Sequence, residues 1–248
     1  MKTKRERIFM DRMHERGNAL IYVLIAIALF AALSFTLSRQ TDTSEAGTLS
    51  QEKAELYATQ LISYAAQARS AIDQMLFTAA SDIDQLDFTA PTDAGFDTGT
   101  LIHKVYHPQG GGLLPGKIPT EAITQVTNDP EPGWYLGRFN NVEWTALAQG
   151  NTAGPGGAEA PWEEVILIAY QINETVCGLI NKKINGSTAI PTMTSSIRNT
   201  LIDDSLHGGT NVELTTDAPD ICPDCANIGS LCVQEGGIYG FYTLLADQ

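Results

Sequence analysis

An uninterrupted apolar run near the N-terminus constrains this chain more than any other feature of its sequence. From Ala19 to Leu37 no residue is charged, and only three side chains carry a hydroxyl group. At about 1.5 Å of rise per residue, a helix of this length just crosses a hydrocarbon layer of roughly 30 Å. A buried core helix is the alternative, but such helices rarely lack a polar face in soluble folds. We therefore expect a transmembrane anchor helix over residues 18–38.

The charges on the two sides of this run predict its orientation. Residues 1–17 form a basic leader with six basic and three acidic side chains, whereas Asp42 and Glu45 follow the run. Because basic flanks stay in the cytoplasm, we expect a single-pass protein of a bacterial inner membrane, with its N-terminus cytoplasmic and its main domain periplasmic or extracellular. A cleaved secretory signal is the alternative, although residues 31–35 make a poor small-residue cleavage site.

A short motif at the start of the apolar run resembles a known family. Residues 16–25 read Arg-Gly-Asn-Ala-Leu-Ile-Tyr-Val-Leu-Ile and are similar to the prepilin signal of type IV pilins and type II secretion pseudopilins. The resemblance implies that the leader is cut after Gly17 and that Asn18 becomes the new N-terminus. It also implies that the apolar segment begins a long helix that packs into a filament.

Tyr22 departs from the pattern of that family. The fifth residue after the cut is usually a Glu, which neutralises the N-terminal amine of a neighbouring subunit, and this sequence has Tyr22 there. A Tyr cannot supply that charge, so an amine buried beside it lacks an ionic partner. Two interpretations stay open: an initiating or otherwise specialised pilin-like subunit, or an uncleaved anchor that does not polymerise.

The remainder of the chain divides into a neck, a second helix and a globular domain. Residues 39–50 are polar and include Gly47, which indicates a flexible neck. Over residues 51–80 apolar side chains recur every three or four positions, which predicts an amphipathic helix. The stripe consists of Ala54, Tyr57, Leu61, Tyr64, Ala68, Ile72, Met75 and Ala79. Residues 81–248 then form an extracytoplasmic domain.

Short apolar segments separated by Gly and Pro predict β structure in that domain. A short helix is expected over residues 173–183, with Asn173 as its N-cap. The expected strands are residues 83–88, 101–106, 133–144, 165–170 and 237–245. The predicted fold class is α+β: a long N-terminal transmembrane and amphipathic helix, then a mainly antiparallel β-rich domain with a short extra helix.

Four cysteines, an even number in a domain expected outside the cytoplasm, predict two disulfides. They are Cys177, Cys222, Cys225 and Cys232. Three pairings are open. Cys222 and Cys225 of the Cys-Pro-Asp-Cys motif can bond to each other, or Cys225 and Cys232 can reach separately to Cys177. Redox catalysis by this motif is disfavoured, because neighbouring carboxylates raise the pKa of a thiol. A four-cysteine zinc site is a further alternative, although the usual second short pair is missing.

Few other residues suggest chemistry. Asp217, Asp220 and Asp224 could offer oxygen ligands to calcium, but a solvated acidic loop explains them better, and we expect no cofactor. His103 and His107 are expected to be isolated surface residues on a strand. Three tryptophans are candidates for a binding surface, although packing explains most tryptophans: Trp134, Trp144 and Trp162. No catalytic motif is present, so we expect no enzyme.

The net charge of the chain is -14, although its leader is basic. So acidic a domain repels phosphate backbones, which argues against nucleic acid as a partner. The partners expected are a membrane and other copies or pilin-like subunits, reached through the N-terminal helix. We therefore predict a pilin-like or pseudopilin-like membrane-anchored structural subunit of a filament or secretion assembly. The alternative is an anchored extracytoplasmic binding module that does not polymerise.

Overall fold

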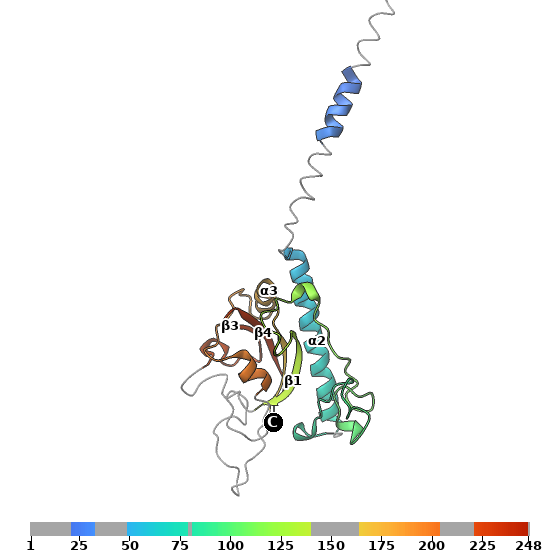
Figure 1. Cartoon of the computed structure of the whole chain (residues 1–248), viewed down its shortest axis with the longest axis vertical. Helices are drawn as coiled ribbons and strands as arrows, with labels where there is room; N and C mark the ends of the chain where they lie inside the picture. The colour runs from blue at the N-terminus through green and yellow to red at the C-terminus, as the bar shows by residue number, and fades with distance from the viewer. Residues whose placement is uncertain (1–20, 33–48, 79–80, 140–163, 204–220, 248) are drawn as a thin grey trace, which may run out of the picture. The chain divides into compact units, whose positions relative to one another are not determined.

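The computed structural model describes residues 21–32, 49–78, 81–139, 164–203 and 221–247 of the chain. The chain divides into two compact units, Met1–Ser50 and Gln51–Gln248. In the first unit, residues 21–32 are helical, and every one of them is exposed. Among the described residues of the second unit are helices α2 and α3 and strands β1 to β4, of which all but β2 are labelled in Figure 1.

No helix within the described ranges is long and apolar enough to cross a membrane. The described helical residues 21–32 rise about 18 Å, compared with roughly 30 Å for a hydrocarbon layer. This finding contradicts the expected transmembrane anchor helix over residues 18–38. It also contradicts the expected single-pass placement in a bacterial inner membrane, because that expectation depended on the same helix.

Helix α2 (Gln51–Phe77) forms where the apolar periodicity predicts it. Its buried residues lie on one face: Ala54, Tyr57, Ala58, Leu61, Ala65, Ala68, Ile72 and Met75. The opposite face carries exposed polar residues such as Glu52, Gln60 and Ser70. The helix ends at Phe77 rather than at residue 80, and Ala79 lies outside the described residues. The stripe therefore packs one side of α2 against the domain, as a period of 3.6 residues requires.

Four antiparallel strands form one sheet in the order β1-β2-β4-β3. Their bounds are Gly133–Phe139 (β1), Glu164–Tyr170 (β2), Ser230–Glu235 (β3) and Ile238–Ala246 (β4). Every residue of β2 is buried, as expected for a central strand whose two faces are both covered. The antiparallel sheet and its helices agree with the α+β part of the expected fold.

Each face of the sheet has its own covering layer. Helices α2 and α3 pack on each other and over β4 on one face (Figure 1). On the other face, alternate strand residues pack against the segments 193–201 and 221–225. This cluster includes Phe139, Ile166, Ile168, Tyr170, Met193, Ile197, Leu201, Ile221, Leu231, Val233 and Tyr242. The second unit is thus a sheet buried on both sides.

Helix α3 (Glu174–Asn185) has well-defined ends. The side chain of Asn173 accepts a hydrogen bond from the backbone N–H of Thr175 at 2.9 Å, so the predicted N-cap is confirmed. Gly186 closes the helix with φ of 83°, a left-handed conformation that glycine adopts without strain. The helix therefore begins where the sequence predicts and extends slightly further.

Two of the expected strands are absent. Residues 83–88 contain a 3₁₀-helix at Ile83–Gln85, and residues 101–106 contain another at Leu101–His103. The two segments meet in a single bridge between Asp87 and Lys104. Backbone hydrogen bonds from the N–H of Asp87 to the carbonyl of His103 and from the N–H of Val105 to the carbonyl of Asp87 join them there, so the two predicted strands reduce to one bridge. Of the predicted strand over residues 133–144, the part beyond Phe139 lies outside the described residues.

Strand β3 was not predicted, although its sequence contains a signal. Residues Leu231 and Val233 alternate with more polar neighbours, and Gly236-Gly237 lies between β3 and the predicted strand β4. Both glycines have positive φ, 58° and 87°. Such a pair forms a tight hairpin whose twist matches that of the strands. The glycine pair therefore indicates a strand on each side of it.

Candidate interaction surfaces

Large apolar side chains cover the described helix of the first unit on all sides. They are between 49% and 76% exposed: Ile21, Tyr22, Val23, Leu24, Ile25, Ile27, Leu29 and Phe30. No residue in 21–32 is charged. Monomeric proteins rarely expose contiguous apolar surface of this kind, and such surface marks an interaction site. Gly17 and Asn18 lie outside the described residues, so cleavage between them stays a prediction.

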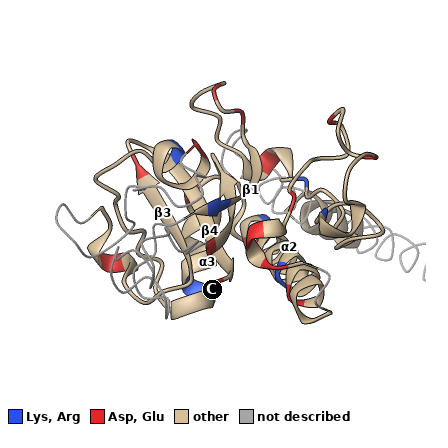
Figure 2. Ribbon diagram, turned by 90° about the horizontal axis from the view of Figure 1, so that it is seen from below, with Lys and Arg blue, Asp and Glu red and all other residues tan. Residues whose placement is uncertain are grey.

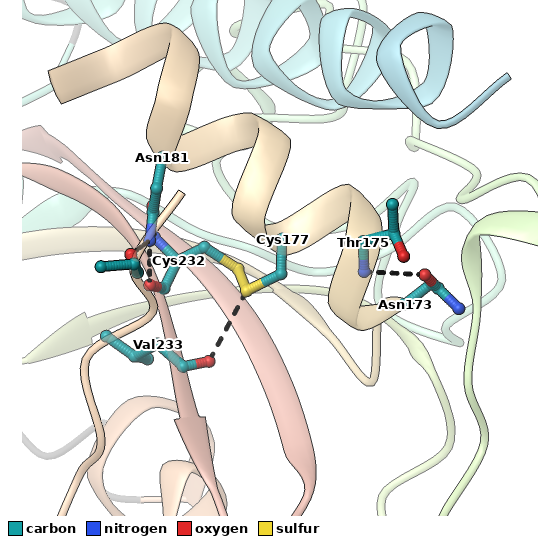
Figure 3. Close-up of a disulfide and its surroundings, with 7 residues drawn as sticks. Asn173, Thr175, Cys177, Asn181, Cys232 and Val233 are labelled. Atoms are coloured by element: carbon teal, nitrogen blue, oxygen red, sulfur yellow. Dashed lines mark hydrogen bonds between the residues drawn. A yellow bond between two sulfur atoms is a disulfide. The ribbon is translucent and has the colours of Figure 1, made fainter. Parts of the chain in front are cut away.

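The cysteines form two disulfides, Cys177–Cys232 and Cys222–Cys225. The first joins helix α3 to strand β3 across 55 positions of sequence, and Figure 3 shows it between the helix and the sheet. The second closes the Cys-Pro-Asp-Cys motif on itself beside the opposite face. All four cysteines are paired in these two disulfides, so none of them is free in this structure to bind zinc as a thiolate.

The outer edge of β3 is closed by neighbouring groups. Asn181 of α3 is fully buried; its Oδ1 accepts a hydrogen bond from the N–H of Cys232 at 2.7 Å, and its Nδ2 donates to the carbonyl of Cys232 at 2.8 Å (Figure 3). At Gln234 the N–H donates to the carbonyl of Pro191, and the carbonyl accepts from the N–H of Met193. The polar groups of this edge are therefore satisfied within the chain.

The outer edge of β1, unlike that of β3, is not closed by backbone hydrogen bonds to another described segment. Within the described residues β1 pairs only with β2, and no backbone hydrogen bond to another segment is made from Gly133 to Gly137. Side chains on one face of the strand are well anchored: Trp134 packs on Tyr64 of α2 at 4.7 Å between ring centroids, and the guanidinium of Arg138 donates to the carbonyls of Ile83 and Asp84. A rigid strand thus presents an open edge.

A strap running from Gly111 to Glu121 lies along helix α2. The hydroxyl of Tyr64 donates to the carbonyl of Leu114 at 3.2 Å and accepts from the N–H of Gly116 at 2.7 Å. Further along, the hydroxyl of Tyr57 donates to the carboxylate of Glu121. Leu114 itself is 80% exposed. The two tyrosines therefore hold the strap against α2, while the apolar side chain of Leu114 faces solvent.

A buried lysine anchors the loop that follows α2. Lys104 is 3% exposed; its ammonium donates to the carbonyl of Gly95 and lies 3.5 Å from Oδ2 of Asp87. Asp87 also accepts from the N–H and the hydroxyl of Thr89. Partial burial raises the pKa of Asp87, but the hydrogen bonds from Thr89 and the charge on Lys104 together lower it below its usual value. The compensated pair is a structural anchor.

The two candidate histidines occupy different surroundings. His107 is buried against Phe96, with ring centroids 5.1 Å apart, and its Nε2 lies 3.7 Å from the carboxylate of Asp97. The prediction of an isolated surface residue is therefore wrong for His107. His103 is partly buried in a 3₁₀-helix, with Nδ1 3.3 Å from the carbonyl of Gln85, so it too is not on a strand.

Metal ligands are not brought together in the part of the chain that the structure describes. No group of three or more His, Cys, Asp or Glu residues there could hold a metal ion. Asp224 is exposed within a 3₁₀-helix, whereas Asp217 and Asp220 lie outside the described residues. In Figure 2 the ribbon positions of the described Asp and Glu residues, in red, are spread over α2 and several loops. The interpretation of this loop as a solvated acidic loop, with calcium as the less favoured alternative, therefore stays a prediction.

Sequence reasoning missed the residues that define both sheet edges. Asn181 was expected to belong to a helix, but nothing in its neighbourhood of sequence indicates that it bonds to a strand fifty residues away. Trp134 was expected as a candidate for binding or packing, and the structure shows it packed on Tyr64. Trp144 and Trp162 lie outside the described residues.

Comparisons with known proteins give no family for this chain. No protein-family model matches it, and neither a curated protein nor a solved structure is significantly similar to it.

Proposed function

We propose that this chain is a pilin-like structural subunit that associates with other copies, or with related subunits, through the apolar helical residues 21–32. The observation that carries the proposal is the exposure of this helix. Eight large apolar side chains are about half exposed or more, and no charge interrupts them. Burying such side chains contributes roughly 1.5–3 kcal/mol each, so lateral packing of identical helices is strongly favoured.

Two further features support the proposal. Residues 16–25 resemble the prepilin signal, and in that family the apolar segment that follows the cut is the packing element. The second unit begins with a long helix, α2, that packs against an antiparallel sheet. This is the order of elements that the resemblance implies for a pilin-like subunit.

The mechanism assigned to the chain is association without catalysis. Apolar helices pack side by side because water is released from their surfaces. The leader is basic, so the residues that follow it are even more acidic than the net charge of -14 of the whole chain, and this charge keeps neighbouring copies soluble.

A binding module that does not polymerise is the second candidate, and Tyr22 favours it. Tyr22 is 68% exposed and stands where the resembled family usually has a carboxylate. Without that carboxylate, an N-terminal amine buried in a helical core has no ionic partner on this residue. In this candidate the helix is covered by a different partner and copies do not meet.

Cysteine cross-linking in the native host separates the two candidates. The four natural cysteines are paired, so Ile25→Cys introduces one free thiol in the apolar helix. We expect this full-length variant to form covalent dimers on mild oxidation. Gln67→Cys, on the exposed face of α2, is the matched control and should stay monomeric.

The double variant Leu24→Glu with Ile25→Cys tests whether apolar packing is responsible. A carboxylate in the packed helices is costly, so the dimer should disappear. If Ile25→Cys alone gives only monomers, self-association is wrong and the non-polymerising module stands. The intact mass of the natural protein adds a separate readout: a chain that begins at Asn18 supports prepilin-type processing, and a chain that keeps residues 1–17 argues against it.

A further inference from the structure

A buried glutamine holds the loop from Val126 to Pro130. Gln171 directly follows β2 and is fully buried. Its Oε1 accepts from the N–H groups of Val126 and Thr127 at 2.5 and 2.8 Å. Its Nε2 donates to the carbonyls of Thr127 and Pro130 at 2.9 and 3.0 Å. The amide thus makes every hydrogen bond available to it, which fixes the backbone of the loop.

Two donors meet at the carbonyl oxygen of Asp129 within this loop. Nη1 of Arg198 lies 3.1 Å from that oxygen, and the hydroxyl of Thr127 donates to it at 3.3 Å. The same hydroxyl accepts from the N–H of Asp129 at 3.1 Å, so it is oriented on both sides. Arg198 is held in turn, because its Nε donates to the carboxylate of Asp203 at 2.5 Å. Both donors are therefore in position before any reaction begins.

The carboxylate of Asp129 lies beside its own backbone carbonyl. Nη1 of Arg198 is also 3.1 Å from Oδ2 of Asp129, so one nitrogen contacts both the carboxylate and the carbonyl oxygen. The Asp129 side chain is 82% exposed, and water reaches it freely. An aspartate carboxylate can attack the carbonyl carbon of its own residue, because the two groups are held close together and the product is an unstrained five-membered cyclic anhydride.

The residue that follows Asp129 makes this peptide bond easier to break. A bond to proline is a tertiary amide, whose nitrogen takes up a proton more readily than an ordinary peptide nitrogen and then leaves as an amine. Asp129-Pro130 is the single Asp-Pro pair of the sequence. Glu131-Pro132 provides an internal comparison, because glutamate would have to close a larger ring. The carbonyl of Glu131 accepts from the uncharged hydroxyl of Tyr135.

We propose that the chain cuts itself at the peptide bond between Asp129 and Pro130. A carboxylate oxygen of Asp129 bonds to the carbonyl carbon of the same residue, and the bond from that carbon to the nitrogen of Pro130 breaks as the nitrogen takes a proton from solvent. Water then opens the anhydride and leaves two carboxylates on Asp129. Negative charge develops on the carbonyl oxygen, where Arg198 and Thr127 donate. The net reaction is hydrolysis of one peptide bond, once per chain.

The two fragments are expected to stay together after the cut. All four cysteines follow Pro130, so neither disulfide joins the fragments. Helix α2 belongs to the first fragment, and its buried stripe packs against α3 and β4 of the second. Cleavage therefore replaces a covalent link between residues 21–32 and the sheet by a non-covalent one. Residues 21–32 take no part in the reaction, so this proposal stands or falls separately from the proposed function.

Timed incubation of the purified full-length chain tests the proposal. The natural chain is kept in one mildly acidic buffer, either folded or unfolded in urea, and its fragments are then followed by mass spectrometry under denaturing conditions. We expect new ends at Asp129 and Pro130, and none at Pro132. They should form at least about tenfold faster in the folded chain, because only the folded chain places both donors. An equal or slower rate in the folded chain would indicate ordinary acid lability and would overturn the proposal.

Variants of the two reacting groups add a second readout. Asp129→Glu keeps the charge of an exposed side chain but should lose the cut. Arg198→Gln and Arg198→Lys should each bring the folded rate close to the rate in urea, since neither offers the fixed donors of a guanidinium. Thermal unfolding shows which variants are folded. Continued cutting by folded Asp129→Glu, or an undiminished rate in a folded arginine variant, would also contradict the proposal. The dimer yield of Ile25→Cys tests the proposed function independently.

Discussion

The side chain of Asn181 takes the place of a fifth strand beside Cys232. Its amide reproduces both hydrogen bonds of a β-ladder, as acceptor from the N–H of Cys232 and donor to its carbonyl, and also donates to the carbonyl of Ala189 at 2.8 Å. The disulfide from Cys177 to Cys232 begins one helical turn earlier on α3. One covalent and one polar link therefore join the same helix to the same strand residue.

Removing the amide of Asn181 should destabilise the domain strongly. Asn181→Leu leaves the N–H and carbonyl of Cys232 buried without partners, which costs about 2–4 kcal/mol of unfolding free energy. Urea denaturation of the two chains measures the difference. Asn185→Leu, an exposed asparagine on the same helix, is the matched control and should cost less than about 1 kcal/mol. Equal losses in the two variants would show that the bonds to Cys232 contribute nothing specific.

The two disulfides should contribute unequally to stability. Cys177–Cys232 closes 55 positions of chain and Cys222–Cys225 closes 3. In the chain-entropy model, removing the first costs about 4 kcal/mol and removing the second about 1.5 kcal/mol. Denaturation of the Cys177→Ala/Cys232→Ala and Cys222→Ala/Cys225→Ala double variants gives the comparison. A larger loss for the second pair would mean that its packing at the buried face outweighs loop closure.

The strap along α2 depends on the absence of a side chain at Gly116. A Cβ there would lie 2.4 Å from ring atoms of Tyr64 and 2.8 Å from Trp134. Gly116→Ala should therefore push the strap off the helix and cost about 1–3 kcal/mol. The thermal unfolding midpoint measures this loss. Gly95→Ala is the control, since its Cβ would meet the nearest atom at an ordinary 3.8 Å. An unchanged midpoint for Gly116→Ala would show that the strap does not depend on this contact.

The anchor at Asp87 predicts a dependence of stability on pH. Because the pKa of Asp87 in the folded chain is lower than its usual 3.8, the ionised form is favoured by folding. Its contribution is present above about pH 4 and is lost as the pH falls through the lowered pKa. The effect is modest, since the Asp87 side chain is 37% exposed and solvent screens the pair.

Asp87→Asn should accordingly lower the unfolding free energy near neutral pH and leave it unchanged in strong acid. Denaturation series at the two pH values measure both effects. Asp84→Asn changes an exposed carboxylate on the same segment and serves as the control. If the difference between Asp87→Asn and the natural chain persists in acid, the contribution comes from hydrogen bonding rather than from the charge.

Local patterns predicted the elements whose residues carry their own signal. Helix α2 has a stripe with a period near 3.6, and its buried residues follow that stripe. Helix α3 begins at a cap whose side chain makes the expected bond. Strands β2 and β4 are short apolar runs bounded by turn residues. In each case the structure needs only neighbours a few residues away.

Where distant residues decide the outcome, the same reasoning failed. Residues 83–88 and 101–106 have strand-like composition, but each segment contains a 3₁₀-helix, and a single bridge between Asp87 and Lys104 joins the two segments. Strand β3 was missed because its strongest signal, Gly236-Gly237, was not used as a hairpin turn. The expected membrane-spanning helix was inferred from apolar length alone.

Four properties could be predicted from the residues alone: the apolar character of residues 21–32, the acidic charge of the chain, the buried stripe of α2 and the presence of paired cysteines. These properties belong to single residues or to neighbours along the chain. The three-dimensional arrangement was needed to show which cysteines pair, that Asn181 closes the edge of β3, and that β1 pairs only with β2 among the described residues. Those outcomes depend on contacts between segments far apart in sequence, and the periodicity of one segment carries no information about the other.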